Sequence, residues 1–305
     1  MKKNEIKKVT VLGGGTMGQQ IALICAQSGC NVDIYDIAVE SFPKFRSRIK
    51  VLSEIFAASG KIPPEQTEQI LTRIRFTGNP AEAAEDADLL SESVPENPSL
   101  KAKIFAEFNA LCPQHTIFTT NTSTLLPSTF AEATGRPQRF AAFHFHDLRV
   151  TSIVDIMPHH KTSSETMEVI RSFACRIGLI PIVMKSESSG YIFNAMFSAL
   201  LRAAENLAAE GIASVEDIDR AWMGVTKMAI GPFGMMDQVG LDTVLSINSN
   251  RAERSHDPID IRNASMLRKY VEHGHLGEKS GRGFYIYPDP AYLNQDFIKG
   301  LKEDV

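Results

Sequence analysis

A glycine-rich turn near the start of the chain has the spacing of a phosphate-binding loop. It reads Gly13-Gly14-Gly15-Thr16-Met17-Gly18 and directly follows the apolar run Val9–Leu12. In the pattern G-x-G-x-x-G, the first glycine permits a sharp turn and the second lets a pyrophosphate approach the backbone. The third lets a helix lie close to the strand. Phosphates would then bind at the start of that helix, at Thr16 and Met17, where unpaired N–H groups and the helix dipole favour negative charge.

An acidic residue beyond the second expected strand indicates which dinucleotide binds. Asp36 ends the run Val32–Tyr35, and 36 − 13 = 23 residues is close to the spacing of about 20 for a carboxylate that binds a ribose 2′-hydroxyl. The next residues, Ile37-Ala38-Val39, include no arginine to receive a 2′-phosphate. The sequence therefore predicts NAD as the cofactor. The alternative is that Asp36 is a solvated acid at a strand end.

His144 is a candidate proton-transfer residue. It follows the apolar strand Phe140–Phe143, at the carboxyl end of a strand, where ligands of such sheets collect. A histidine can take a proton from a hydroxyl and return it near neutral pH. Asp155, on the next expected strand, is the nearest carboxylate that could orient its ring. The alternatives are a strand-end histidine with a satisfied hydrogen bond and a purely structural carboxylate.

The elements that must position these residues form two regions. Up to residue 187, short apolar strands alternate with amphipathic segments, a pattern typical of a parallel sheet covered by helices. Further strands are expected at residues 75–77, 89–91, 116–119, 140–143, 153–156 and 181–183, and helices at 21–28, 100–111 and 166–176. Residues 42–72 are charged and helical in pattern, with a break at Pro63-Pro64. From residue 191 to 210 the apolar residues recur at helical spacing. The sequence thus predicts a Rossmann-type domain at 1–187 and a helical domain at 188–305.

Composition excludes several functional classes. With 305 residues and 43% hydrophobic composition, the chain can bury a sizeable core and form two domains. A net charge of −4 argues against a nucleic-acid partner. The four cysteines lack C-x-x-C spacing, which favours reduced thiols in the cytoplasm. No apolar run is long enough to span a membrane. We expect a cytoplasmic protein with no nucleic-acid or membrane partner.

Seven motifs, taken in order, resemble those of the L-3-hydroxyacyl-CoA dehydrogenase family, and the resemblance runs from about residue 5 to residue 287. They are Gly13 to Gly18; Val94-Pro95-Glu96-Asn97; Asn121-Thr122-Ser123-Thr124-Leu125; His144-Phe145; Gly190-Tyr191-Ile192-Phe193-Asn194; Gly231-Pro232-Phe233 with Asp237 and Val239-Gly240-Leu241-Asp242; and Gly277 to Tyr285. The serine and histidine stand 144 − 123 = 21 residues apart, as in the family pattern.

The resemblance implies a fold and a set of roles. The fold is a Rossmann-type doubly wound parallel sheet followed by an all-α C-terminal domain like that of 6-phosphogluconate dehydrogenase. The implied roles are His144 as general base, Ser123 and Asn194 near the substrate oxygens, and Asn121, Glu96, Lys101 and Lys279 beside NAD. Simpler alternatives remain for four of them: Ser123 as a helix cap, Asn194 as a buried amide between helices, and Lys101 and Lys279 as surface lysines.

Two departures from the family pattern bear on the substrate. The family usually reads His-Phe-Phe-Asn-Pro, but this chain has His144-Phe145-His146-Asp147-Leu148. The family's histidine usually pairs with a glutamate, whereas Asp155 is one methylene shorter, and the loop from His144 to Asp155 is about one residue tighter. These changes resemble a branch that includes reductases of β-keto acids and diketo esters. No metal is expected, because His146 and the pair His159-His160 lack other metal ligands in the sequence.

The sequence therefore predicts an NAD-dependent oxidoreductase that interconverts L-3-hydroxyacyl-CoA and 3-ketoacyl-CoA. One alternative keeps the mechanism and takes free 3-hydroxy acids, β-keto acids or diketo esters. Another is a catalytically inactive NAD-binding protein with a structural or sensing role. The helix at 191–210 has more apolar residues than one narrow face needs. We expect it to contact a second subunit in a homodimer, the alternative being a core contact within one chain.

Overall fold

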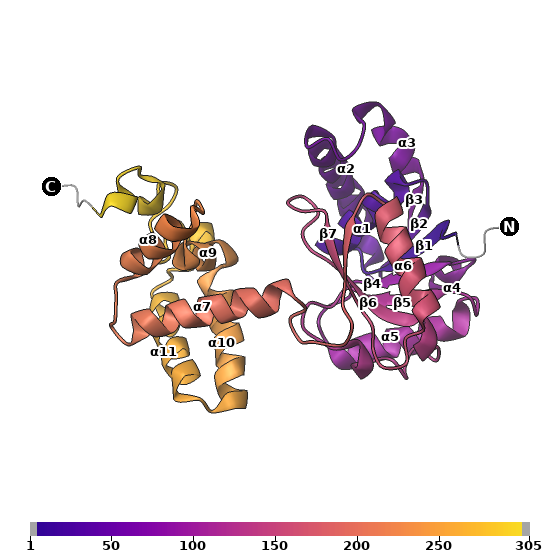
Figure 1. The fold of residues 1–305 in the computed structure, drawn as a ribbon. Helices are drawn as coiled ribbons and strands as arrows, with labels where there is room; N and C mark the ends of the chain where they lie inside the picture. The colour runs from indigo at the N-terminus through magenta and orange to yellow at the C-terminus, as the bar shows by residue number, and fades with distance from the viewer. Residues whose placement is uncertain (1–4, 301–305) are drawn as a thin grey trace. The chain divides into compact units, whose positions relative to one another are not determined.

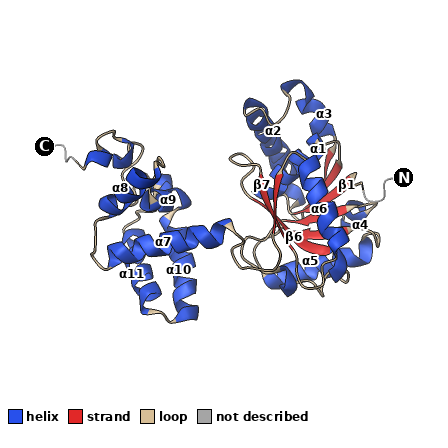
Figure 2. Ribbon diagram, in the orientation of Figure 1, coloured by secondary structure: helices blue, strands red, loops and turns tan. Residues whose placement is uncertain are grey.

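The computed structural model describes residues 5–300. The chain divides into two compact units between Ile192 and Phe193, a few residues beyond the boundary expected after residue 187. The first unit contains the sheet and the second is helical, as Figures 1 and 2 show. The Rossmann-type domain followed by an all-α domain is thereby confirmed.

The first unit is built on one eight-stranded sheet with the order β3-β2-β1-β4-β5-β6-β7-β8. The strands are β1 (Lys8–Leu12), β2 (Asn31–Tyr35), β3 (Ile74–Thr77), β4 (Leu89–Glu92), β5 (Ile117–Thr120), β6 (Phe140–Phe145), β7 (Ile153–Met157) and β8 (Ile180–Val183). All expected strands are present with slightly shifted bounds. Neighbouring strands are parallel except β6 and β7, which are antiparallel. The strand order reverses between β1 and β4, the position where doubly wound sheets bind ligands.

Helices cover both faces of this sheet. They are α1 (Thr16–Gln27), α2 (Phe42–Ala58), α3 (Thr67–Thr72), α4 (Pro80–Ala84), α5 (Pro98–Leu111) and α6 (Ser164–Arg176). Alternate strand residues such as Val9 and Val11 pack in one apolar core with α1, α2 and α6. Leu12, Leu90 and Phe118 face the opposite way and pack against α4 and α5. The break expected at Pro63-Pro64 is confirmed, because it separates α2 from α3.

Between residues 193 and 300, five α-helices pack around an apolar core of their own. These are α7 (Phe193–Ala209), α8 (Val215–Thr226), α9 (Pro232–Val239), α10 (Leu241–Ser255) and α11 (Pro258–Glu272). This core includes the fully buried Phe233, Met236, Leu241 and Leu267. Within residues 5–300, none of the helices is both long enough and apolar enough to cross a bilayer.

Two buried carboxylates tie the C-terminal motifs of the second unit together. Asp219 accepts hydrogen bonds from the backbone of Phe233 and Gly234, and Asp237 accepts them from the backbone of Phe284 and Tyr285. A Cβ on Gly231 would lie 2.4 Å from the Asp219 carboxyl carbon, so only glycine allows this approach. These contacts give the Gly231-Pro232-Phe233 motif an architectural role.

Candidate active site

Three of the four glycines in the Gly13–Gly18 turn, those of the G-x-G-x-x-G pattern, differ in the space around them. Gly13 has φ +102°, and a Cβ on it would lie 2.7 Å from the Ser93 carbonyl oxygen. A Cβ on Gly18 would lie 1.9 Å from the Gly13 carbonyl oxygen. A Cβ on Gly15, in contrast, would meet nothing within 4 Å. Gly13 and Gly18 are therefore required by the fold, whereas Gly15 leaves an open approach to the backbone.

The loop and helix fit the pyrophosphate of NAD. Helix α1 begins at Thr16, and its N-cap, Gly15, has no side chain that could cap the first N–H groups. The N–H groups of Thr16 and Met17 would hold the phosphates. Asp36 Oδ2 accepts from Gly14 N at 2.7 Å, and its Oδ1 accepts from Ala38 N at 2.9 Å. These bonds fix the carboxylate beside the glycine loop, where a ribose hydroxyl would bind.

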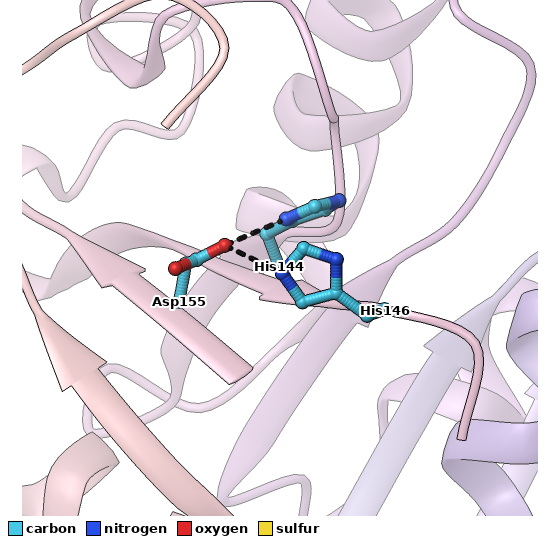
Figure 3. Close-up of side chains that lie close together, drawn as sticks. All are labelled: His144, His146 and Asp155. Atoms are coloured by element: carbon cyan, nitrogen blue, oxygen red, sulfur yellow. Dashed lines mark hydrogen bonds and ion pairs between the residues drawn. The ribbon is translucent and has the colours of Figure 1, made fainter. Parts of the chain in front are cut away.

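His144 and Asp155 form a buried pair across two strands. They lie directly opposite each other in the antiparallel register of β6 and β7, so their side chains share one face of the sheet. His144 Nδ1 lies 3.2 Å from Asp155 Oδ2 (Figure 3), and the two residues are 5% and 2% exposed. Strand β6 extends to Phe145, so His144 is the second-last residue of the strand and does not follow the strand as the sequence predicted.

A second imidazole binds the same carboxylate oxygen. His146 Nε2 lies 2.9 Å from Asp155 Oδ2, and Figure 3 shows both rings directed at that oxygen. Burial tends to raise the pKa of Asp155, but the hydrogen bonds from His144 and His146 lower it to about 2. The carboxylate is thus ionised near neutral pH and can only accept, so both rings must donate an N–H to it.

The expectation that His146 lies apart from other metal-ligand residues is wrong. The His144, His146 and Asp155 ligand atoms all lie within 4.8 Å of one another. The sequence could have predicted this cluster, because residues two apart on a strand point to the same face and Asp155 was expected on the neighbouring strand. Nitrogen and carboxylate oxygen are ligands that zinc accepts. The two charge-assisted hydrogen bonds account for the positions of both rings without a cation.

Tyr191 connects His144 to the loop that contains Ser123. Its ring stacks on His144 with centroids 4.6 Å apart and planes at 25°, and its hydroxyl donates to the Thr122 carbonyl oxygen at 2.6 Å. Tyr191 is 2% exposed and has φ +55°, a conformation rare for a large side chain. It had no role in the sequence-based prediction beyond its motif. Half-buried Ser123 therefore directly follows Thr122, the residue that is hydrogen-bonded to the ring stacked on His144.

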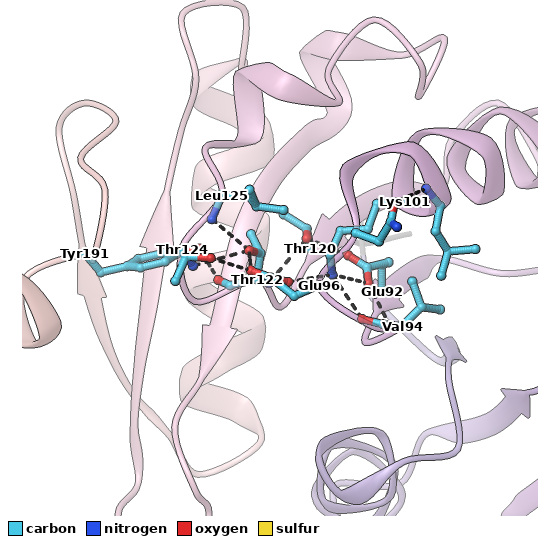
Figure 4. Close-up of polar contacts among 11 residues, drawn as sticks. Glu92, Val94, Glu96, Lys101, Thr120, Thr122, Thr124, Leu125 and Tyr191 are labelled. Carbon is cyan, nitrogen blue, oxygen red and sulfur yellow. Dashed lines mark hydrogen bonds and ion pairs between the residues drawn. The ribbon is translucent and has the colours of Figure 1, made fainter. Parts of the chain in front are cut away.

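A polar network holds the residues on both sides of Ser123 (Figure 4). Thr122 and Thr124 both donate their hydroxyls to Glu96 Oε1, the latter at 2.9 Å. Burial tends to raise the pKa of Glu96, but the Thr122 hydroxyl and the Lys101 charge outweigh it and lower the pKa. The expected alternative of Ser123 as a helix cap is wrong, because the next helical turn, Pro127–Thr129, has Leu126 at its N-cap.

Lys101 holds the Glu96 side of this network, and Asn121 holds the start of the loop that contains Ser123. The Lys101 ammonium lies 2.6 Å from Glu92 Oε1, 3.2 Å from Glu96 Oε2 and 3.2 Å from the Val94 carbonyl oxygen. At 1% exposure, Lys101 is not the surface lysine of the alternative interpretation. Asn121 Oδ1 accepts from Phe145 N at 2.7 Å and so joins the loop to the end of β6. Contact of Glu96, Lys101 or Asn121 with the cofactor stays a prediction.

Asn194 and Lys279 belong to the second unit. Asn194 lies half-buried in the first turn of α7. Lys279 is about half exposed and pairs with Asp242 at 2.5 Å. Their expected places beside the substrate and NAD stay predictions.

Comparisons with known proteins match both units. Residues 8–187 match the model of the 3-hydroxyacyl-CoA dehydrogenase NAD binding domain, and residues 190–287 match that of the C-terminal domain. A probable 3-hydroxybutyryl-CoA dehydrogenase of Bacillus subtilis is 33% identical, over 93% of this chain and 99% of the relative. The mitochondrial hydroxyacyl-coenzyme A dehydrogenase of Homo sapiens is 34% identical, over 94% of this chain and 93% of the relative. Among solved structures, a diketoreductase has a TM-score of 0.86 at 37% identity, over 92% of this chain and 99% of its own.

These matches agree with the fold and with the dinucleotide loop. Both domain models match in the order in which the units occur, and the relatives align along nearly their whole lengths. The chain therefore belongs to the 3-hydroxyacyl-CoA dehydrogenase family and is an NAD-dependent oxidoreductase.

Proposed function

We propose that this enzyme interconverts L-3-hydroxyacyl-CoA and 3-ketoacyl-CoA, with His144 as the general base. The observation that carries the proposal is the buried His144–Asp155 pair near the end of β6. Strands β1, β4, β5 and β6 are parallel, so the glycine loop after β1 and His144 lie at the same edge of the sheet. A base and a dinucleotide cradle on one sheet edge suit the oxidation of an alcohol.

The hydrogen bonds assign each atom of the pair a role. Asp155 accepts the Nδ1–H of His144, which leaves the lone pair on Nε2 to take the hydroxyl proton. The ionised carboxylate then stabilises the imidazolium, and the proton returns to the oxygen in the reverse direction. Bound NAD supplies the carbon that accepts the hydride. Ser123 would donate a hydrogen bond to the reacting oxygen, and the Asn194 amide would orient the substrate carbonyl.

The acyl carrier is the finer part of the proposal. Four exposed basic residues of α2, Lys44, Arg46, Arg48 and Lys50, provide positive charge suited to a CoA phosphate. The His146 and Asp155 departures support the second candidate, a free 3-hydroxy acid, β-keto acid or diketo ester. The structural similarity to a diketoreductase supports it too.

A homodimer through the second unit is also proposed. Met196, in the first turn of α7, is 63% exposed, and Phe193 beside it is 52% exposed, so this end of the helix presents apolar surface that a second subunit could cover. The competing interpretation is a core contact within one chain, and Phe193 does stack on Phe197 of the same helix. Light scattering coupled to gel filtration should give twice the chain mass for the wild type and the single-chain mass for Met196→Glu. A wild-type monomer would overturn the dimer.

The test of the substrate is NADH oxidation followed separately with acetoacetyl-CoA, free acetoacetate and a diketo ester. Turnover of acetoacetyl-CoA with the highest kcat/KM supports the thioester. Turnover of the CoA-free compounds alone would replace the thioester by the second candidate. NADH binding without turnover of any of them would favour an inactive NAD-binding protein.

A further inference from the structure

We propose that His146 is a positioning residue that acts on the reaction through Asp155. The inference rests on the proposed role of His144 as general base and adds a second histidine to that machinery. His146 holds the carboxylate at the place where it must meet the His144 ring.

The geometry of the strands brings the three side chains to one point. His144 lies opposite Asp155 in the β6–β7 ladder, and His146, two residues further, projects to the same side. The ring centroids of His144 and His146 are 4.7 Å apart at an interplanar angle of 67°. Both nitrogens reach one oxygen, Oδ2, at 3.2 Å and 2.9 Å. The shorter of the two bonds belongs to His146.

An aspartate needs this second contact to face the ring in one orientation. Its carboxylate can rotate about the terminal bond of the side chain, and such rotations have broad, weakly defined minima. The Nε2–H of His146 approaches Oδ2 from a direction different from that of His144 Nδ1, as Figure 3 shows. Two donors from different directions define where Oδ2 lies. Asp155 is 2% exposed, so water cannot easily take the place of a missing donor.

One ring face of His144 is covered by Tyr191, whose ring stacks on it with the two centroids 4.6 Å apart. His144 is thus held by a ring contact on one side and by a carboxylate on its Nδ1. What remains free to move is the Asp155 carboxylate, which can rotate, and the hydrogen bond from His146 restricts that rotation. The arrangement predicts the Nδ1–H tautomer for His144 and the Nε2–H tautomer for His146, because an ionised carboxylate only accepts.

The first test compares two substitutions of His146 in the full-length enzyme. His146→Phe keeps an aromatic ring but cannot donate, and it should lower kcat about tenfold, with KM and NADH affinity unchanged. His146→Gln places an amide N–H near the same point and should recover most of the lost rate. His160→Phe, at an exposed histidine of the same unit, should behave as the wild type. Equal losses in His146→Phe and His146→Gln, or none in either, would overturn the inference.

A double-mutant cycle tests whether the effect passes through Asp155. In the Asp155→Asn background, His146→Phe should cause little further loss, because the group that His146 positions has already been removed. The same tenfold loss in both backgrounds would show an action independent of Asp155 and would contradict the proposal.

A spectroscopic readout separates this inference from the proposed reaction. The ¹⁵N chemical shifts of the imidazoles of the whole protein, assigned with His146→Gln, should show His146 protonated on Nε2 and His144 protonated on Nδ1. A His146 protonated on Nδ1 alone would overturn the inference even if the enzyme is fully active. If His144→Ala retains turnover, the general-base proposal fails, whereas wild-type kcat in His146→Phe beside an inactive His144→Ala removes only the role of His146.

Discussion

Replacing Asp155 with asparagine changes the active site by one atom and removes the charge that supports His144. The pKa of Asp155 lies at about 2, against an ordinary value of 3.8, because two imidazole donors outweigh the cost of burial. This difference corresponds to about 2.4 kcal/mol in favour of the ionised form, or a factor of about 60. An amide NH₂ facing His144 would also force the ring to protonate on Nε2, a change that costs about 10⁴ in rate where a histidine base depends on its tautomer.

We therefore expect Asp155→Asn to lower kcat by between about 60-fold and about 10⁴-fold. Turnover is measured as NADH absorbance in a stopped-flow instrument, and NADH affinity, measured by fluorescence, should not change. Asp147→Asn is the matched control, because Asp147 lies on the loop between β6 and β7, is more exposed than Asp155 and pairs with Arg149 instead. A fall of less than about threefold, which corresponds to about 0.6 kcal/mol, would refute the reasoning.

The same residue contributes a pH dependence to stability. The folded-state pKa of Asp155 is lowered, so its contribution is present above pH 3.8 and is lost as the pH falls towards 2. Asp155→Asn should reduce the acid sensitivity of the first unit in that range.

Three further predictions concern other parts of the chain. Gly15→Ala should leave the melting temperature unchanged and weaken NADH binding, because the added Cβ would meet no protein atom but would fill space that the pyrophosphate needs. Gly18→Ala should unfold the loop, because its Cβ would lie 1.9 Å from the Gly13 carbonyl oxygen. Lys101→Met should cost about 3–5 kcal/mol in chemical denaturation, since it leaves a buried carboxylate without its cation. Glu205→Gln should stabilise the second unit above pH 7. Burial raises the pKa of the 1% exposed Glu205 to about 7, so the wild-type protein loses stability as the pH rises from 4.5 through 7 and this carboxyl group ionises.

The last of these has a convenient probe. Trp222 is the only tryptophan of the sequence and lies on α8, so its fluorescence follows the unfolding of the second unit alone. The full gain in the free energy of unfolding for Glu205→Gln is about 3 kcal/mol, which follows from the difference between the ordinary pKa of 4.5 and the raised pKa of about 7. If Glu205→Gln shows the same slope of unfolding free energy against pH as the wild type, the raised pKa of Glu205 is contradicted.

The fold and the dinucleotide loop were predictable because local pattern determines them. Period-two apolar strands and the glycine spacing are short-range signals, and every expected strand was found. The antiparallel pairing of β6 and β7 was not anticipated, since alternating strands and helices favour a parallel sheet. That pairing is what places His144 opposite Asp155.

Contacts between residues far apart in the sequence explain what the sequence pattern did not show. Tyr191 stacks on a residue 191 − 144 = 47 positions away, and no periodicity links the two. Lys101 is expected at the surface by residue type, but Glu92 and Glu96 enclose its ammonium. His146 could have been found from its two-residue spacing once Asp155 was placed on the neighbouring strand.

The most direct test of the central claim is His144→Ala, with NADH affinity and single-turnover NADH oxidation measured on the same preparation. We predict unchanged NADH affinity and a rate reduced by about 10²-fold or more, the contribution of a positioned general base. Turnover close to that of the wild type, with the fold intact, would contradict the role of His144.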